Sequence, residues 1–257
     1  MESKNKILEM KNIVMRYHTL NGETLAVNDF NLDIFKGEFL SIVGPSGCGK
    51  STILSLISGL MVPSDGKIVF DQNKSPNQVV GYMLQRDYLL SWRTIRQNIL
   101  LGLEIKKNLN EKSENYALSL LERYNLGKFK DYYPSQLSGG MRQKVALIRT
   151  LVVKPDLLLL DEPFSALDYQ TRLNLSQEVR NIIKTEKKTA VLVTHDISEA
   201  ASLSDRVAVL SARPSKIKKI IEIDKDFRNL PADKKRRSKK FNDYFDVIWS
   251  ELNEKKN

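Results

Sequence analysis

The sequence has one cysteine, no long apolar run and no low-complexity segment. A single cysteine, Cys48, cannot form an internal disulfide, which excludes a disulfide-stapled secreted fold. A membrane-spanning helix needs about 20 mostly apolar residues, and no window supplies them. No apolar stretch of signal-peptide length follows Met1. If the chain works at a membrane, we therefore expect another chain to cross the bilayer.

Positive charge is unevenly distributed along the 257 residues, whose formal net charge is +10. Residues 213–240 hold 12 Lys or Arg against 4 Asp or Glu, so the rest of the chain is near neutral. A near-neutral body argues against a basic nucleic-acid groove, and we expect no nucleic-acid partner. Hydrophobic residues make up 41% of the chain and charged residues 28%, which is typical of a globular protein with a real core.

Short apolar segments bounded by turn residues predict a parallel α/β sheet. Between about Arg86 and Leu137 the pattern becomes helical and polar, which predicts a small helical insertion rather than a loop. Helices are expected over Ser51–Leu60 and, with an amphipathic pattern, over Glu114–Tyr124. The segments predicted as strands are Ile7–Met15, Leu25–Ile34, Glu38–Val43, Lys67–Asp71, Val79–Leu84, Leu157–Leu160, Ala190–Thr194 and Val207–Leu210.

A glycine-rich segment between a predicted strand and a predicted helix fits the pattern G-x-x-x-x-G-K-[ST] at every fixed position. Glycines let backbone N–H groups turn toward phosphate oxygens, and the following helix adds a positive dipole end. Lys50 is expected to contact the terminal phosphates, and the Ser51 hydroxyl to ligate Mg²⁺. The alternative, a glycine-rich turn with a chance Lys-Ser, is weaker because motif and context agree. The residues predicted to hold the nucleotide here are Gly44, Pro45, Ser46, Gly47, Cys48, Gly49, Lys50, Ser51 and Thr52.

Two carboxylates, Asp161 and Glu162, follow the apolar run Leu157–Leu160. Open α/β sheets bind ligands at the C-terminal ends of their strands, so both acids are expected near the phosphate-binding segment. Asp161 is expected to hold Mg²⁺ through water, and Glu162 to polarise the attacking water as a general base. Alone, the pair leaves open the simpler interpretation that both acids end a core strand. Together with the phosphate-binding segment it indicates a P-loop NTPase.

The segment Leu137–Gln143, about twenty residues before the acidic strand, resembles the signature motif of the ATP-binding-cassette (ABC) family. Met141 replaces the glutamine of its usual form, Leu-Ser-Gly-Gly-Gln. Ser138, Gly139 and Gly140 lead into a helix and form a second phosphate-facing N-terminus. An ordinary helix cap is the alternative. Two phosphate-binding elements beside one set of nucleotide residues indicate that the second serves a neighbouring chain.

Four further residues resemble the family in the right order. Gln85, after the predicted strand Val79–Leu84, resembles the Q-loop glutamine, which implies contacts with Mg²⁺ and the attacking water. Asp168, in Ser-Ala-Leu-Asp, resembles the D-loop. His195 resembles the switch histidine, which implies contact with the γ-phosphate, and Tyr17 resembles the aromatic residue that stacks on adenine. A structural histidine and a core tyrosine are the alternatives.

The resemblance spans about Leu8–Leu210 and implies a P-loop NTPase of the α/β class, with a RecA-like core, an antiparallel β subdomain and an inserted helical subdomain. The expected ABC ATPase domain covers 1–225, with the helical subdomain at about 86–156 and a basic helical tail over 226–257. The implied cofactors are ATP and Mg²⁺. The implied catalytic residues are Lys50, Gln85, Glu162 and His195, the metal ligands Ser51, Gln85 and Asp161, and the further nucleotide contacts Tyr17, Ser138, Gly139, Gly140 and Asp168.

Family members act as head-to-tail dimers, with two ATP molecules between one chain's phosphate cradle and the other's signature. The alternative is a soluble member of the superfamily in DNA repair, chromosome organisation or translation. That alternative predicts coiled-coil heptads, zinc cysteines or two cassettes in one chain, and the sequence has none of them. We therefore expect a peripheral ATPase on the cytoplasmic face of the cell membrane. Its expected partners are a second copy, permease subunits and, indirectly, an extracellular solute-binding protein.

The segment Tyr82–Ile95 is similar to ATPases that serve uptake of nitrate, sulfonate, taurine, bicarbonate or thiamine-precursor pyrimidines, which implies import. In that subgroup a Leu-Leu-Pro-Trp-type stretch follows the Q-loop, and Ser91 here replaces the proline. Trp92 and its neighbours are expected to form a socket for a permease's coupling helix. Core packing of Trp92 is the alternative.

The basic segment Lys234–Lys240 leaves two interpretations open. A membrane-surface or nucleic-acid contact is one of them. We favour the other, a solvated helix face on a C-terminal tail, followed by an amphipathic helix over Phe241–Leu252.

Overall fold

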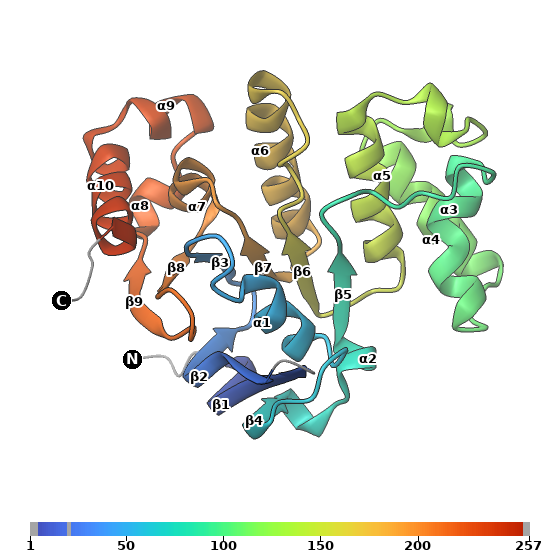
Figure 1. Cartoon of the computed structure of the whole chain (residues 1–257). Helices are drawn as coiled ribbons and strands as arrows, with labels where there is room; N and C mark the ends of the chain where they lie inside the picture. The colour runs from blue at the N-terminus through green and yellow to red at the C-terminus, as the bar shows by residue number, and fades with distance from the viewer. Residues whose placement is uncertain (1–4, 20–21, 254–257) are drawn as a thin grey trace.

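The computed structural model describes residues 5–19 and 22–253, which form two β-sheets with helices packed around the larger one (Figure 1). Residues 1–4, 20–21 and 254–257 lie outside the described residues, and with them the first residues of the predicted ATPase domain and the last of the predicted tail. The predicted α/β class is confirmed. Within the described ranges, no helix combines the length and apolar character needed to cross a bilayer.

The larger sheet has six strands in the order β5-β6-β7-β3-β8-β9. The first five run parallel to one another, and β9 pairs antiparallel with β8. Strands β3, β7 and β8 are buried at every residue, as expected for parallel strands covered on both faces. Sequence analysis did not predict β9. The strands are β3 (Phe39–Val43), β5 (Val80–Met83), β6 (Leu157–Asp161), β7 (Thr189–Val193), β8 (Arg206–Leu210) and β9 (Ile217–Glu222).

Alternate residues of β6 face two different hydrophobic cores. Leu157 and Leu159 pack in a cluster with helix α1 and the smaller sheet, whereas Leu158 and Leu160 pack with α5 and α6. All four leucines are fully buried, so the strand is fixed on both faces and only Asp161 at its end is partly exposed. The helices around the sheet are α1 (Lys50–Ile57), α5 (Gly139–Val152), α6 (Tyr169–Thr185) and α7 (Ile197–Leu203).

The smaller sheet is antiparallel, with the strand order β2-β1-β4. Its strands are β1 (Lys6–Thr19), β2 (Gly22–Phe35) and β4 (Asp65–Phe70). The first two extend beyond their predicted ends because they pair with each other from Lys6 opposite Phe35 to Thr19 opposite Gly22. This sheet shares its core with α1, which brings β1 beside the start of that helix.

A group of helices lies to one side of the sheet, at the right of Figure 1. Buried Ile99, Leu121 and Leu147 join α3, α4 and α5 in the same cluster as β6 and α6. The predicted amphipathic helix is α4, whose N-cap Asn110 accepts a hydrogen bond from Ser113 N. The predicted limits of the helical subdomain, 86–156, stay a prediction. The other helices of this group are α3 (Ile95–Ile105) and α4 (Glu111–Arg123), with single turns at Gly127–Phe129 and Pro134–Gln136. Two further single turns, Asp71–Asn73 and Pro76–Val79 (α2), connect β4 to β5.

The C-terminal helices pack on α7 and the sheet (Figure 1). Phe227 and Ile248 are fully buried in a cluster with Val207 of β8. The predicted amphipathic helix over Phe241–Leu252 is α10, which buries its apolar face in that cluster. The domain limits at 225 and 226 stay a prediction. The helices of this region are α8 (Lys225–Arg228), α9 (Ala232–Arg237) and α10 (Lys239–Asn253).

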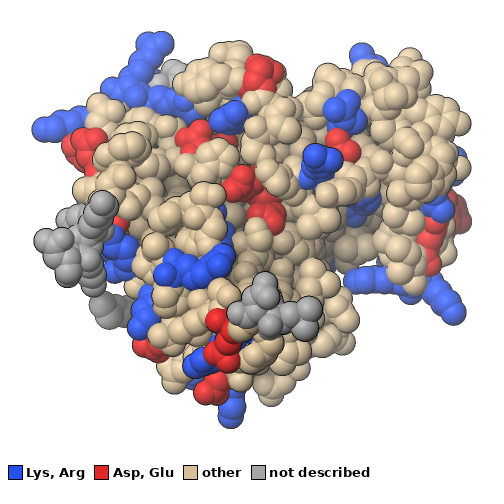
Figure 2. All heavy atoms as spheres, in the orientation of Figure 1, with Lys and Arg blue, Asp and Glu red and all other residues tan. Residues whose placement is uncertain are grey.

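The basic segment runs through α9 into the start of α10. Figure 2 shows Lys and Arg side chains gathered over α9, at the upper left of the view. The expectation of a solvated helix face is wrong for Lys235, which is only 5% exposed. Its Nζ donates a hydrogen bond to the carbonyl oxygen of Ser202 at 3.1 Å, at the end of α7. One residue of the segment therefore holds α9 against the body of the protein.

Candidate functional site

The phosphate-binding segment forms a loop between β3 and α1 that only glycine can build at several points. Gly47 and Gly49 have φ angles of 72° and 111°, in the left-handed region that side chains rarely adopt. A Cβ at Gly44 would lie 2.8 Å from Sγ of Cys48 and 2.9 Å from Cβ of Leu210. The loop therefore curls tightly at the C-terminal edge of the sheet, where α/β proteins bind ligands.

Lys50 folds back over this loop. Its Nζ donates hydrogen bonds to the carbonyl oxygens of Gly44 at 2.8 Å and Pro45 at 3.0 Å, and the residue is 8% exposed. No side chain caps α1, so the N–H groups of its first turn have no partner within the helix. A fixed ammonium group beside an uncapped helix N-terminus fits the phosphate chain of ATP.

Two further side chains flank the loop. Cys48 is 1% exposed and packs inward, and burial raises the pKa of its thiol. From the loop after β8, Arg213 donates a hydrogen bond from Nη2 to the carbonyl oxygen of Gly47 at 3.0 Å. Sequence analysis missed Arg213, because no local pattern connects it to a segment 166 residues earlier. It adds a second positive charge beside the cradle.

Tyr17 of β1 lies against the first turn of α1. Its hydroxyl is 2.9 Å from Oγ1 of Thr52 and donates a hydrogen bond to Sδ of Met61 at 3.5 Å. The structure thus brings Tyr17 to the edge of the cradle, 35 residues away in sequence. Its stacking on adenine stays a prediction.

Asp161 and Ser51 meet at the C-terminal end of β6. Tyr82 of β5 donates a hydrogen bond from its hydroxyl to Oδ2 of Asp161 at 3.2 Å, and the Ser51 hydroxyl also bonds this carboxylate. Burial raises the pKa of Asp161, and the charge of Glu162 adds to the rise, against both hydrogen bonds. A bound cation would relieve this unfavourable burial of charge. Sequence analysis gave Tyr82 no role.

Oxygen ligands of this kind fit Mg²⁺. In the described part of the chain, no group of three or more His, Cys, Asp or Glu side chains could hold a metal ion. Mg²⁺ does not need such a cage, because it usually keeps several waters and takes phosphate oxygens as ligands. Ser51 and Asp161 are the residues placed to hold it.

Gln85 makes other contacts than those expected of a metal ligand. Its Nε2 donates to Oγ of Ser165 at 3.2 Å, and its carbonyl oxygen accepts from Nε2 of Gln143 at 3.5 Å. Ser165 in turn donates to the carbonyl oxygen of Glu162 at 2.9 Å. Gln85 therefore links α5 to the loop that carries Glu162, and its contact with Mg²⁺ stays a prediction.

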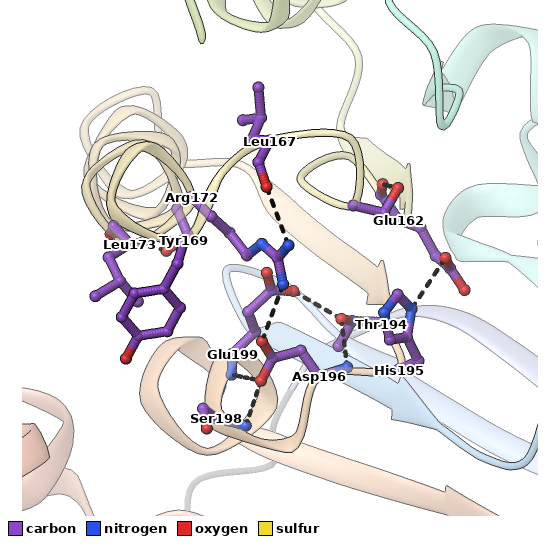
Figure 3. A network of polar contacts seen from close by, with 12 residues as sticks. Glu162, Leu167, Tyr169, Arg172, Leu173, Thr194, His195, Asp196, Ser198 and Glu199 are labelled. Atoms are coloured by element: carbon purple, nitrogen blue, oxygen red, sulfur yellow. Dashed lines mark hydrogen bonds and ion pairs between the residues drawn. The ribbon is translucent and has the colours of Figure 1, made fainter. Parts of the chain in front are cut away.

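Glu162 and His195 face each other across the ends of β6 and β7 (Figure 3). The distance from Oε2 of Glu162 to Nδ1 of His195 is 3.1 Å. The Glu162 N–H donates to the carbonyl oxygen of Val193 at 2.9 Å, and φ of Glu162 is 43°. The side chains are 22% and 58% exposed, so water reaches both. An accessible carboxylate held by a histidine can accept a proton from an attacking water.

The signature residues lie against the loop after β6 and not against the cradle. A Cβ at Gly139 would lie 3.2 Å from Cδ2 of Leu167, and one at Gly140 would lie 3.2 Å from Cγ2 of Thr171. Ser138 caps α5 by accepting a hydrogen bond from its first turn. No hydrogen bond between described residues joins this segment to the cradle. The chain therefore has two segments of the phosphate-binding type, the cradle and the signature, and does not bring them together.

Asp168 acts as the N-cap of α6. Its Oδ1 accepts a hydrogen bond from Thr171 N at 3.0 Å, and the bond lowers the pKa of this exposed carboxyl. Because the neighbouring Leu167 and Thr171 contact the signature glycines, Asp168 belongs to the same surface. Its contact with nucleotide stays a prediction.

A polar network ties the loop after β6 to the loop after β7 (Figure 3). Arg172 donates from Nη2 to the carbonyl oxygen of Leu167 at 3.0 Å, and its Nη1 lies 3.6 Å from Oδ2 of Asp196. Asp196 caps α7, and Oγ1 of Thr194 donates to Oε2 of Glu199 at 2.7 Å. His195 is therefore held between two residues with fixed partners. Sequence analysis missed this network, whose members come from three separate elements.

Glu199 is the buried acid of the network. It is 5% exposed, and burial raises its pKa to about 7, with the nearby charge of Asp196 adding to the rise and the Thr194 hydrogen bond opposing it. Glu199 therefore changes its protonation state near neutral pH, next to the loop that carries His195.

Replacing Glu199 with glutamine should make the free energy of unfolding less sensitive to pH. Because the pKa of Glu199 is raised in the folded state, its protonated form stabilises the folded parent. This contribution is complete below the ordinary pKa of glutamate and is lost as pH rises through about 7. Glutamine keeps an acceptor for Thr194 and cannot ionise. Relative to the parent, Glu199→Gln should gain stability between about pH 5 and pH 8, by on the order of 3 kcal/mol. Urea unfolding across this range measures the difference.

Glu178→Gln is the matched control, because Glu178 is 53% exposed on the neighbouring α6. Its effect should stay small at every pH. A Glu199→Gln curve parallel to that of the parent would contradict the assignment of Glu199.

Comparison with known proteins shows which family this chain resembles in sequence. Residues 27–165 match the family model described as ABC transporter. A relative from Bacillus subtilis (strain 168), named as an uncharacterized ABC transporter ATP-binding protein, YtlC, is 46% identical over 96% of this chain and 95% of its own. The aliphatic sulfonates import ATP-binding protein SsuB of Bacillus cereus (strain ATCC 10987 / NRS 248) is 39% identical over 89% of each chain.

A solved structure gives the same result for the fold. The dimeric structure of a bacterial ABC transporter cassette superposes with a TM-score of 0.72 at 30% identity, over 84% of this chain and 99% of that one. The same cassette has also been solved as a dimer in a post-hydrolysis state bound to ADP and Pi, with a TM-score of 0.71. The solved cassette thus forms a dimer with nucleotide.

Proposed function

The chain belongs to the ABC transporter family and is an ATPase of that family; on this premise we propose that it drives an importer, as a self-paired motor bound to separate permease subunits. The proposed location is the cytoplasmic face of the membrane, where ATP is available. The observation that carries the proposal is a surface of exposed apolar side chains around Gln85.

The proposed dimer is head to tail. The signature residues of one chain lie near Leu167 and Thr171 and not against its own cradle. In that cradle, Ser46 and Gly47 are exposed. A second copy turned through half a rotation would place its signature over the first cradle and receive the same in return. Since one sequence carries every motif, we propose two copies of this chain and two ATP molecules.

The proposed mechanism uses residues from both copies. ATP with Mg²⁺ supplies the reacting phosphate. Lys50 and the first turn of α1 would bind the phosphate chain, while Ser51 and Asp161 would hold Mg²⁺. Glu162 takes the proton of the attacking water, and His195 keeps that carboxylate oriented. Ser138 and its glycines from the second copy complete the positive surroundings, so closure of the pair and catalysis depend on each other.

The segment 84–92, which contains Gln85, presents large apolar side chains to solvent. Leu84 is 43% exposed, Tyr88 58% and Trp92 73%. The alternative that Trp92 packs in the core is therefore wrong. Arg149 of α5 fixes the segment by donating to the carbonyl oxygen of Tyr88 at 2.7 Å. Rigid exposed aromatic residues are the usual anchors of protein interfaces, which supports docking of a permease helix here.

Replacing Trp92 with alanine should weaken binding to the membrane subunit at least about 10-fold, because such an anchor contributes about 2 kcal/mol or more when buried. The tagged chain would be captured from detergent-solubilised membranes of its own cell, and the integral membrane protein bound to it would be quantified by mass spectrometry.

Trp249→Ala is the matched control, since Trp249 is 55% exposed on α10, in the separate C-terminal region. Both variants should unfold within about 2 °C of the parent, because neither tryptophan is buried. Capture of no membrane protein, or equal capture by both variants, would contradict the proposed docking surface.

The solutes that we propose are those served by similar ATPases. The resemblance of Tyr82–Ile95 includes ATPases for nitrate, sulfonate, taurine, bicarbonate and thiamine-precursor uptake, and the relative SsuB is named for aliphatic sulfonates. We propose a small solute of this group, delivered by an extracellular binding protein. The solute never touches this chain, so its identity depends on the partner subunits.

A further inference from the structure

A basic cavity of about 580 Å³ lies between the end of α6 and helices α8 and α9. Seven Lys or Arg side chains line it, against the single acid Asp205. Its volume falls within the range of roughly 300–1,000 Å³ that small-molecule pockets occupy. Charges of one sign around a concave surface concentrate the electrostatic potential and attract ions of the opposite sign. None of the residues assigned to ATP binding or hydrolysis lines this cavity.

The α6 side supplies four of these charges. Arg180 pairs with Asp205, with 2.7 Å between its Nη2 and Oδ1 of the acid. Lys184, Lys187 and Lys188 form no ion pair with any described side chain. The negative end of the α6 dipole stabilises the charge of Lys184, which lies in the last turn of the helix. It does not account for the positive charges that face it from α8 and α9.

The opposite side adds Lys225, Arg228 and Lys235. Nη1 of Arg228 lies 2.9 Å from the same Oδ1 of Asp205, so one carboxylate serves two guanidinium groups. The Nε of Arg228 is buried without a hydrogen-bond partner among the described atoms. Lys235 is 5% exposed, and its Nζ donates to a backbone carbonyl oxygen and lies 5.9 Å from the centre of the Phe227 ring, with no carboxylate among the described side chains as a partner. Buried cations are normally paired, and these are not fully paired.

Burial and the charge imbalance together lower the pKa of Lys235. Burial lowers its pKa to about 8, and the charge of Arg180 adds to the fall. Asp205 opposes these effects, whereas Lys184 and Arg228 lower the pKa further. The cavity thus holds its lysine in an electrostatically unfavourable place that an anion would relieve.

We propose that this cavity binds a small, multiply charged phosphate compound free in solution. Arg and Lys side chains from three elements converge on it, which suits a ligand with several negative oxygens. These side chains surround a recess between helices rather than a flat face, so a compact free molecule fits better than the headgroup of a membrane lipid. Lys235 connects the site to the end of α7 through Ser202.

Inorganic tripolyphosphate is the probe, titrated by calorimetry without Mg²⁺ into a full-length Lys50→Ala background that weakens phosphate binding in the cradle. We expect saturable binding of one ion per chain. Lys184→Gln with Lys188→Gln should weaken it at least about 10-fold, because two neighbouring charges are lost. Lys112→Gln with Lys130→Gln removes the same charge from the helical side and should change it less than about 2-fold. Bound probe should also protect Lys225, which lines the cavity and is exposed, from acetylation, read by mass spectrometry.

Three outcomes would overturn the proposal. One is the absence of saturable binding, and another is an equal loss in both double variants. The third is a lipid site: binding to vesicles of phosphatidylglycerol that the Lys184→Gln and Lys188→Gln pair abolishes, with no binding of tripolyphosphate. Vesicle binding that this pair leaves unchanged, alongside tripolyphosphate binding that it weakens, supports a site for a free anion.

Discussion

Replacing Glu162 with glutamine should lower ATP turnover by at least about 100-fold while ATP stays bound. The carboxylate lies at the end of a strand buried on both faces, is open to water, and is 3.1 Å from Nδ1 of His195. Glutamine has the same size and keeps a hydrogen-bonding group toward the histidine, but it cannot accept a proton. Because the phosphate contacts of Lys50 and α1 remain, nucleotide binding should persist, and the pair of chains should stay closed. Phosphate release and size-exclusion chromatography with ATP measure the two effects.

Glu111→Gln, on the exposed first turn of α4, removes a carboxylate far from the site and should leave turnover near that of the parent. Turnover of Glu162→Gln within about twofold of the parent would remove Glu162 from the role of general base. Loss of ATP binding in this variant would instead make Glu162 a binding residue.

A second large effect is expected at the signature. In the Glu162→Gln background, Ser138→Arg should abolish the ATP-induced dimer and leave nucleotide binding by the single chain within about twofold. Ser138 lies away from its own cradle, beside Gly139 and Leu167, so a bulky cation there cannot disturb phosphate binding in the same chain. It would obstruct the cradle of a second copy. Sedimentation with ATP and fluorescence titration of a nucleotide analogue separate the two properties.

Ser119→Arg is the matched control, since Ser119 is exposed on α4 and should leave the dimer intact. If Ser138→Arg weakened nucleotide binding by the isolated chain as strongly as it weakened the dimer, the signature would act on its own cradle. The head-to-tail proposal would then be wrong.

The cradle was predictable because its parts are contiguous. Strand, glycine loop, Lys50 and helix follow one another within a short stretch, and each obeys a local rule of backbone geometry. The same holds for Ser138 and Asp168, which begin helices by capping them. The pair of acids was predictable from the apolar run before it, because four consecutive leucines buried on both faces leave little choice but a central strand.

Contacts between distant segments escaped prediction. Arg172, Asp196 and Glu199 are ordinary polar residues of helix starts, and only the fold places them between the loop after β6 and the loop after β7. Lys235 belongs to a charge run that would normally lie in water. Its burial follows from the packing of Phe227 and α10 on α7, which no local pattern encodes. Strand β9 lies at the edge of the sheet and was missed because its basic residues mask the apolar pattern by which a strand is recognised.

Helix α6 is one straight piece of 17 residues with a different task at each end. At about 1.5 Å per residue it is roughly 25 Å long, and a tilt of about 5° around one end moves the other by about 2 Å. Asp168 stands at its first end, beside the signature surface where we propose that a second copy docks, and Lys184 at its last, in the basic cavity. A shift of about this size at the lysine end would therefore change hydrogen-bond distances at the proposed dimer surface, so an anion bound in the cavity could alter the pairing of the two copies.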